Sequence, residues 1–173
     1  MSEYHKLEGK GSWVSAHKVN KWNKYSMQLH LSPKSLEYAR ELIATKGLMN
    51  KISKDDDGWF IRLSRPSQIQ LKTGKIAGME PPAVLDGQHP ITQPDGKVIF
   101  PPLIEPIGNG SDVVAKVEVY SYNDPMNPGK KKYAMRWDSL LVNNLVPFNK
   151  PSFNENLENA NKLFEDHPKQ EGW

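Results

Sequence analysis

Apolar and polar side chains alternate along several stretches of the chain, and alternation with a period of two predicts β-strands. The clearest stretches are residues 24–31, 58–65 and 110–124, and residues 133–148 form a last long strand or a pair of strands. One parity of each strand is expected to face a core: Tyr25, Met27, Leu29 and Leu31; Trp59, Ile61 and Leu63; Val113, Ala115, Val117 and Val119; Tyr133, Met135 and Trp137. The sequences AVLD and KVIF add two short strands.

A helical pattern follows the first of these strands. Ser32 suits an N-cap, Pro33 suits the first helical position, and Gly47 suits the end of the helix. An apolar stripe runs along this segment and predicts an amphipathic helix packed on a sheet; it consists of Leu36, Ala39, Leu42 and Ile43. A second helix is expected over residues 154–166.

Glycine and proline crowd the segment from Thr73 to Asn109, which predicts long loops with only short strands between them. One helix among strands of mixed length predicts a mainly β fold with minor α, closed as a small barrel or a sandwich. We expect one domain over residues 1–150, followed by an acidic C-terminal helix or tail over residues 151–173.

The charge is distributed unevenly. Residues 151–173 hold five acidic residues against two lysines, a net charge of −3, and residues 1–150 hold 21 basic against 15 acidic residues, a net charge of +6. A basic body indicates a polyanionic partner. The chain has no cysteine, which excludes disulfides and thiolate metal sites and fits a reducing compartment. No apolar run approaches the length of a membrane span, and the N-terminal residues lack the apolar region of a secretory signal.

No motif indicates catalysis, a cofactor or a metal site. The histidines lack zinc-ligand spacing, and His30 is expected on the surface. Asp55, Asp56 and Asp57 precede Gly58 without the spacing of a calcium loop, so a solvated turn is expected. The sequences GKGS and GNGS lack the spacing of a phosphate-binding loop. We therefore expect a protein that is not an enzyme.

The outward parity of the strands carries aromatic rings beside cations. On the strands these residues are Phe60, Arg62, Lys116, Tyr120, Tyr122, Lys132 and Arg136, and the loops beside them add Arg65, Lys72, Lys75, Lys130 and Lys131. Aromatic rings stack on unpaired bases and cations follow the phosphates, so this combination is typical of single-stranded nucleic-acid binding. The structural alternative is that the tyrosines are present because strands favour them, and lie beneath a loop or the C-terminal helix.

The order of these segments resembles the single-stranded DNA-binding proteins of tailed bacteriophages over residues 20–150. The segments are NKYSMQLHL with the helix after it, GWFIRLSRP, PPAVLDGQHPI, IGNGSDVVAKVEVYSY, a Gly/Lys hairpin and YAMRWDSLLVNNLVPF. The most similar positions are Pro82, Val84 and Asp86, and Ile107, Gly108, Gly110 and Ser111. The resemblance implies an OB-type five-stranded Greek-key barrel that binds and protects single-stranded DNA during replication and recombination, in the cytoplasm of the infected bacterial cell.

Members of that family often end in an acidic tail with a terminal aromatic residue, which recruits replication enzymes and competes with DNA. This chain ends acidic and closes on Gly172 and Trp173, so the resemblance implies that Trp173 binds a partner. The segment differs from such a tail in its lysines and its helical pattern, and packing of Trp173 against the domain is the alternative.

Other functions remain open at this point. They are an RNA-binding module on the same barrel, and a phage structural or assembly protein that is oligomeric and uses its aromatic face to bind another subunit. An enzyme acting on nucleic acid would require clustered carboxylates, which the sequence does not single out.

Overall fold

The computed structural model describes residues 2–147, so the expected helix over 154–166 and Trp173 lie outside the described residues. Its elements are β1 (Ser2–Ser15), β2 (Lys24–Leu31), α1 (Pro33–Lys46), β3 (Ile52–Asp55), β4 (Gly58–Pro66), β5 (Gln68–Gln70), β6 (Ile76–Gly78), β7 (Ala83–Asp86), β8 (Ile91–Thr92), β9 (Val98–Ile99), β10 (Ser111–Asn123) and β11 (Lys131–Asn144). Within the described part, no helix is long and apolar enough to cross a bilayer.

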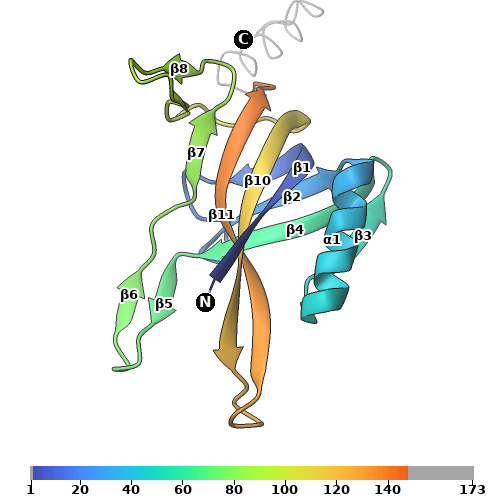
Figure 1. The fold of residues 1–173 in the computed structure, drawn as a ribbon, viewed down its shortest axis with the longest axis vertical. Coiled ribbons are helices and arrows are strands. Elements are labelled where there is room, and N and C mark those ends of the chain that lie inside the picture. The colour runs from blue at the N-terminus through green and yellow to red at the C-terminus, as the bar shows by residue number, and fades with distance from the viewer. Residues whose placement is uncertain (1, 148–173) are drawn as a thin grey trace, which may run out of the picture.

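The strands form one large sheet and two small hairpins (Figure 1). The large sheet has seven strands in the order β3-β4-β2-β1-β10-β11-β7, and only β7 pairs in parallel, with β11. The long strands β1, β2, β4, β10 and β11 curve so that β4 approaches β11, which is the strand order of an OB-type Greek key. The prediction of a mainly β, OB-like fold is therefore confirmed.

The predicted closure of the barrel is wrong, because the sheet is open between β4 and β11. At this seam a side chain takes the place of a backbone ladder. Arg65 on β4 donates one hydrogen bond from Nη1 to the Trp137 carbonyl oxygen on β11 (3.3 Å) and another from Nε to the Glu80 carbonyl oxygen (2.8 Å). The guanidinium therefore links the two edges that a closed barrel would pair.

The predicted inward parity matches the core except at Trp59 on β4, which is 38% exposed and lies beside Arg40 of α1 (4.8 Å from the ring centroid). Val113, Ala115, Val117 and Val119 on β10 are all buried, and Trp137 on β11 is fully buried with its indole N–H donated to the Ser139 carbonyl oxygen (3.0 Å). Burying a Leu, Ile or Val side chain contributes about 1.5–3 kcal/mol, so this continuous core supplies the main driving force for the fold.

Helix α1 has the predicted ends. The Ser32 side chain accepts a hydrogen bond from the Ser35 backbone N–H (3.3 Å), and Gly47 ends the helix in the left-handed conformation at φ 65°. Leu42 packs with Leu48 and Val119, next to Tyr133 and Met135, so α1 covers the inner side of the β10–β11 pair.

Strand β1 was not predicted from the sequence. It lies at the centre of the sheet between β2 and β10, although among its residues only Leu7 and Gly11 are buried. Gly9 lies so close to β2 that a Cβ would clash with the His30 carbonyl oxygen. Gly9 therefore permits close approach of the β2 backbone, and the GKGS sequence is part of a strand.

The most family-like positions support the strands. Val84 and Asp86 are buried on β7, where Asp86 accepts a hydrogen bond from the Gln88 backbone N–H (2.9 Å). The Ser111 hydroxyl donates to the Gly108 carbonyl oxygen (2.8 Å), and a Cβ at Gly108 would clash with the carbonyl oxygens of Val146 and Pro147. In the structure these residues therefore stabilise β7, the turn that follows it and the turn before β10.

Candidate nucleic-acid interface

The outward residues at one end of β1, β10 and β11 form a continuous surface, which we call the tyrosine face. The backbone register places Tyr4 beside Glu118 and Glu118 beside Arg136, and it places Tyr120 and Tyr122 in the next rows. Directly opposed residues on adjacent strands point to the same side of a sheet. The tyrosine face comprises Ser2, Tyr4, Lys6, Lys116, Glu118, Tyr120, Tyr122, Lys132, Ala134 and Arg136.

Two tyrosine rings of this face are paired with cations. The Lys116 ammonium lies 4.5 Å from the centroid of the Tyr4 ring, and the Arg136 guanidinium carbon lies 4.7 Å from that of Tyr120. Tyr4 and Tyr122 are exposed, and Tyr120 is half-buried. The face thus combines accessible aromatic surface with positive charge, as single-stranded nucleic acid requires.

Glu118 holds Arg136 in position. The Arg136 Nε and Nη2 atoms both lie 3.0 Å from Glu118 Oε2, and the Ser2 hydroxyl donates to Oε1 (2.8 Å). The hydrogen bond from Arg136, followed by that from Ser2, holds the pKa of the buried Glu118 carboxyl below its ordinary value. The charge of Arg136 is therefore compensated by Glu118. The guanidinium, held in this place against the Tyr120 ring, positions that ring.

Glu118→Gln is expected to lower the free energy of unfolding at pH 7 by about 1.5–3 kcal/mol, because Arg136 loses a charged hydrogen-bond acceptor. A depressed carboxyl pKa stabilises the fold above the pKa of the unfolded chain, and this contribution is lost as the pH falls through the folded-state pKa. The difference from wild type, measured by urea unfolding, should thus shrink below about pH 4.5. The exposed Glu105→Gln is the control, and a difference independent of pH would contradict the assignment.

Phe60 and Arg62 lie on β4, away from the tyrosine face in the order of the sheet. Phe60 opposes His30 on β2, with 5.3 Å between the ring centroids, and the Arg62 guanidinium carbon lies 5.9 Å from the Phe60 ring. Arg62 is exposed and Phe60 is half-buried. We call these residues with His30 and Gln28 the β4 face, a second site where an aromatic ring and a cation share one surface.

The remaining predicted cations have different surroundings. Lys72 lies in the exposed turn between β5 and β6, and Lys130, Lys131 and Lys132 lie at the tip of the β10–β11 hairpin. Lys132 is 3.5 Å from Asp124, and Lys116 is 3.9 Å from Asp138. Arg65 is half-buried at the seam, so its geometry is that of a structural residue. Within residues 2–147, Arg62, Lys72, Lys130 and Lys131 form no ion pair.

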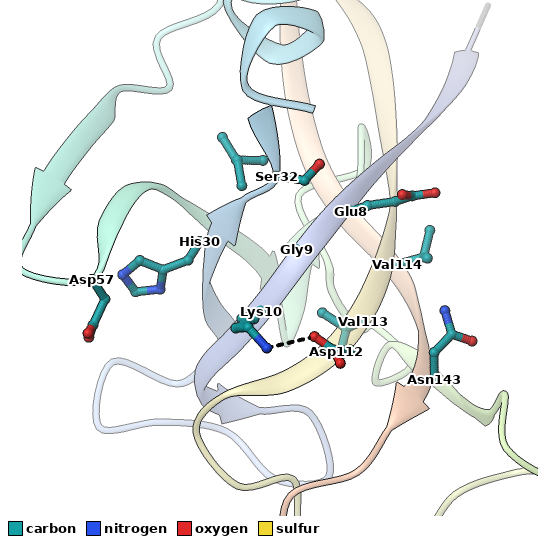
Figure 2. A pocket seen from close by; sticks show the side chains of 11 residues that line it. Glu8, Gly9, Lys10, His30, Ser32, Asp57, Asp112, Val113, Val114 and Asn143 are labelled. Atoms are coloured by element: carbon teal, nitrogen blue, oxygen red, sulfur yellow. Dashed lines mark hydrogen bonds and ion pairs between the residues drawn. The ribbon is translucent and has the colours of Figure 1, made fainter. Parts of the chain in front are cut away.

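A groove of about 480 Å³ crosses β1 between β2 and β10 (Figure 2). Its only lysine, Lys10, is bound to Asp112 (2.9 Å), which lowers the pKa of that carboxyl. Glu8 and Asp57 also line the groove, so carboxylates outnumber cations there. This charge disfavours a phosphate group, and we exclude the groove from the interface.

His30 differs from its prediction. Its side chain is only 11% exposed, because the ring packs against Phe60 and lies 2.9 Å from Asp55. This contact is the main cause of the lowered pKa of Asp55. Single ligand atoms of His30, Asp55 and Asp57 all lie within 4.8 Å of one another, so these residues could together hold a transition-metal ion.

Two exposed tryptophans were missed from the sequence. Trp13 and Trp22 are each 67% exposed, at the end of β1 and in the β1–β2 connection, and the Lys21 ammonium lies 4.4 Å from the Trp22 ring. Both lie in a segment for which the sequence predicted no element. The eight residues between Trp13 and Trp22 show no alternation that would place either ring on a strand face, so their exposure could be known only from the structure.

The fold of this chain is similar to that of solved phage proteins. One is gp2.5, a single-stranded DNA-binding protein encoded by bacteriophage T7; it aligns over 100% of this chain and 98% of its own, with a TM-score of 0.56 and 13% identity. The fold is that of phage single-stranded DNA-binding proteins. The single-stranded DNA-binding protein of bacteriophage Enc34 aligns over 85% of this chain and 84% of its own, with a TM-score of 0.51 and 16% identity. No protein-family model matches the sequence, and no curated protein matches it significantly.

The phage single-stranded DNA-binding fold explains the order of segments noted in the sequence. At these identities the likeness concerns the fold. The structure gathers the predicted residues into the tyrosine face, the β4 face and two hairpin tips, except Arg65, which lies at the seam between β4 and β11.

Proposed function

We propose that this protein binds single-stranded DNA without sequence preference, through the tyrosine face and the β4 face. The observation that carries the proposal is the pairing of outward aromatic rings with cations on the outer surface of the sheet, at Tyr4, Tyr120 and Phe60. The likeness of the fold to two phage proteins that bind single-stranded DNA supports the same function.

The aromatic rings would bind bases by stacking, and the cations would bind phosphates. Each base stacked on an aromatic ring contributes on the order of 1–3 kcal/mol, and every base presents a flat surface, so stacking does not select sequence. Arg62, Lys72, Lys130 and Lys131 lack ion-pair partners within residues 2–147, which makes them the cations most suited to phosphate contacts. Lys116, Lys132 and Arg136 would contribute mainly by positioning the rings and raising the local potential.

The biological role that fits this activity is protection of single strands during phage DNA replication and recombination in the cytoplasm of the bacterial host. No catalytic step is assigned. Recruitment of phage or host replication enzymes through the acidic C-terminus and Trp173, and assembly into a homo-oligomer, are further parts of the proposal that follow from the sequence.

A tryptophan-fluorescence titration with poly(dT) at several salt concentrations tests the function. Trp13 and Trp22 are exposed reporters, whereas Trp137 is buried. If about three to five cations contact phosphates, the slope of log K against log salt should lie near −2 to −3.5, at about −0.7 per contact. Arg62→Ala should reduce the steepness by about 0.7. Lys34→Ala, on α1, is the control and should leave the slope unchanged. A wild-type affinity that does not depend on salt concentration would contradict the proposed phosphate contacts.

The same titration separates the alternatives. Stacking and charge alone should favour neither DNA nor RNA strongly, so a strong preference for a matched RNA oligonucleotide would indicate recognition of the 2′-hydroxyl. Absence of binding to either, together with a stable oligomer at micromolar concentration, would indicate an assembly protein.

A further inference from the structure

An apolar cavity of about 560 Å³ lies at the end of the sheet opposite the tyrosine face. It is formed by the end of β1 and the start of the β1–β2 connection, packed against the loop before β10. Its lining includes Trp13, Val14, Ala16, Val19, Pro106 and Ile107. This volume lies in the range of small-ligand sites, which are mostly apolar with a few polar groups at the edge.

Trp13 is held at this cavity in an unfavourable backbone conformation. Its φ is 52°, in a region that glycine adopts readily and bulky residues rarely adopt. The backbone N–H of Trp13 donates to the Asn109 side-chain oxygen (2.9 Å), and the β1–β2 pairing is irregular between Ser12 and Ser15. Backbone strain of this kind is concentrated at functional sites, and here it presents a side chain that is 67% exposed.

One cation, Lys18, belongs to the cavity lining, beside His17. Lys21 follows in the same β1–β2 connection, with its ammonium 4.4 Å from the centroid of the Trp22 ring. The backbone of this turn is held by Asn20, whose side-chain oxygen accepts hydrogen bonds from the backbone N–H groups of Trp22 (2.9 Å) and Lys24 (3.1 Å). A flat apolar group attached to an anion therefore matches this site in shape and charge.

We propose that the cavity at Trp13 receives one unpaired base of the bound single strand, with the indole as the stacking surface and Lys18 beside the adjoining phosphate. This inference rests on the proposed function and extends it. The site lies outside the tyrosine face and the β4 face, so it lengthens the path of the strand around the end of the sheet.

The test uses the full chain and a labelled oligo(dT) about as long as an OB-fold site, up to 16 nucleotides, followed by fluorescence anisotropy. Trp13→Ala should weaken binding about tenfold, and Trp13→Phe should retain most of the affinity. Trp13→Gly should bind as weakly as Trp13→Ala, yet unfold at the same or a higher urea concentration than wild type, because glycine adopts a positive φ without strain. If Trp13 had a merely structural role, Trp13→Gly would instead unfold at a lower urea concentration than wild type.

A second measurement asks which group occupies the cavity. Single abasic positions are moved along the oligonucleotide, and one of them should weaken binding of the wild type but not of Trp13→Ala, since the two changes remove the same contact. Two results would overturn the inference and leave the proposed function standing. One is that, at every abasic position, the losses of affinity from the missing base and from Trp13→Ala multiply, as independent effects do. The other is that Trp13→Ala binds with wild-type affinity. Tighter binding by Trp13→Ala would also overturn it, because a protein segment would then compete for the cavity. Failure of the wild type to bind oligo(dT) would instead remove the proposed function.

Discussion

Replacing Tyr120 and Tyr122 together by alanine is expected to weaken poly(dT) binding at least 30-fold. Each ring supplies about 1 kcal/mol or more when a base stacks on it, so the pair accounts for about 2 kcal/mol or more. Tyr122 is exposed and Tyr120 is half-buried beside Arg136, and both side chains lie on the same side of β10. The affinity should be measured by fluorescence titration at one fixed salt concentration.

The control is Tyr38→Ala. Tyr38 is also an exposed tyrosine, but it belongs to α1 and its hydroxyl contacts His5, which lies on the opposite side of β1 from Tyr4. This variant should bind as the wild type does. Tyr120→Phe should also retain affinity, because the ring remains. Wild-type affinity in the double variant, with its unfolding transition intact, would show that DNA binds elsewhere on the molecule.

Gly9→Ala should lower the free energy of unfolding by roughly 3 kcal/mol or more. The added methyl group would overlap the His30 carbonyl oxygen and the neighbouring backbone of Leu31, which cannot move without breaking the pairing of β1 with β2. Because β1 joins both halves of the sheet, the cost falls on the whole domain. Urea unfolding followed by tryptophan fluorescence measures this loss.

Gly78→Ala provides the matched control. Gly78 is also a strand glycine, on β6, with open space where a Cβ would stand and no positive φ. Its replacement should change stability by no more than about 0.5 kcal/mol. Equal stability of the two variants would mean that β1 and β2 separate easily at Gly9.

The sequence predicted the helix and the strands whose local signals agree with their burial. Ser32, Pro33 and Gly47 define α1 because capping acts within a few residues, and the valines of β10 alternate because one side is the core. The resemblance and the strand pattern together indicated the OB-like order, although only the pairing in space could reveal the open seam at Arg65.

What remained hidden depended on distant contacts. Strand β1 looks polar because most of its side chains face solvent, and the glycine at position 9 is explained by the backbone of β2. The compensation of Arg136 by Glu118 follows from their opposition across two strands. Trp13 and Trp22 carry no periodic signal, so their exposure could not be inferred before the connection between β1 and β2 was seen.

The end of the β10–β11 hairpin extends past the rest of the sheet (Figure 1). Strand β1 pairs with β10 only as far as Tyr120, so Ser121, Tyr122 and Asn123 are supported by β11 alone. A two-stranded ribbon without a third strand is only marginally stable in water, and its amide hydrogens exchange through local opening. A ligand bound at Tyr122 is therefore expected to restrict the local opening of this ribbon, and part of its binding free energy offsets the conformational entropy that the ribbon loses.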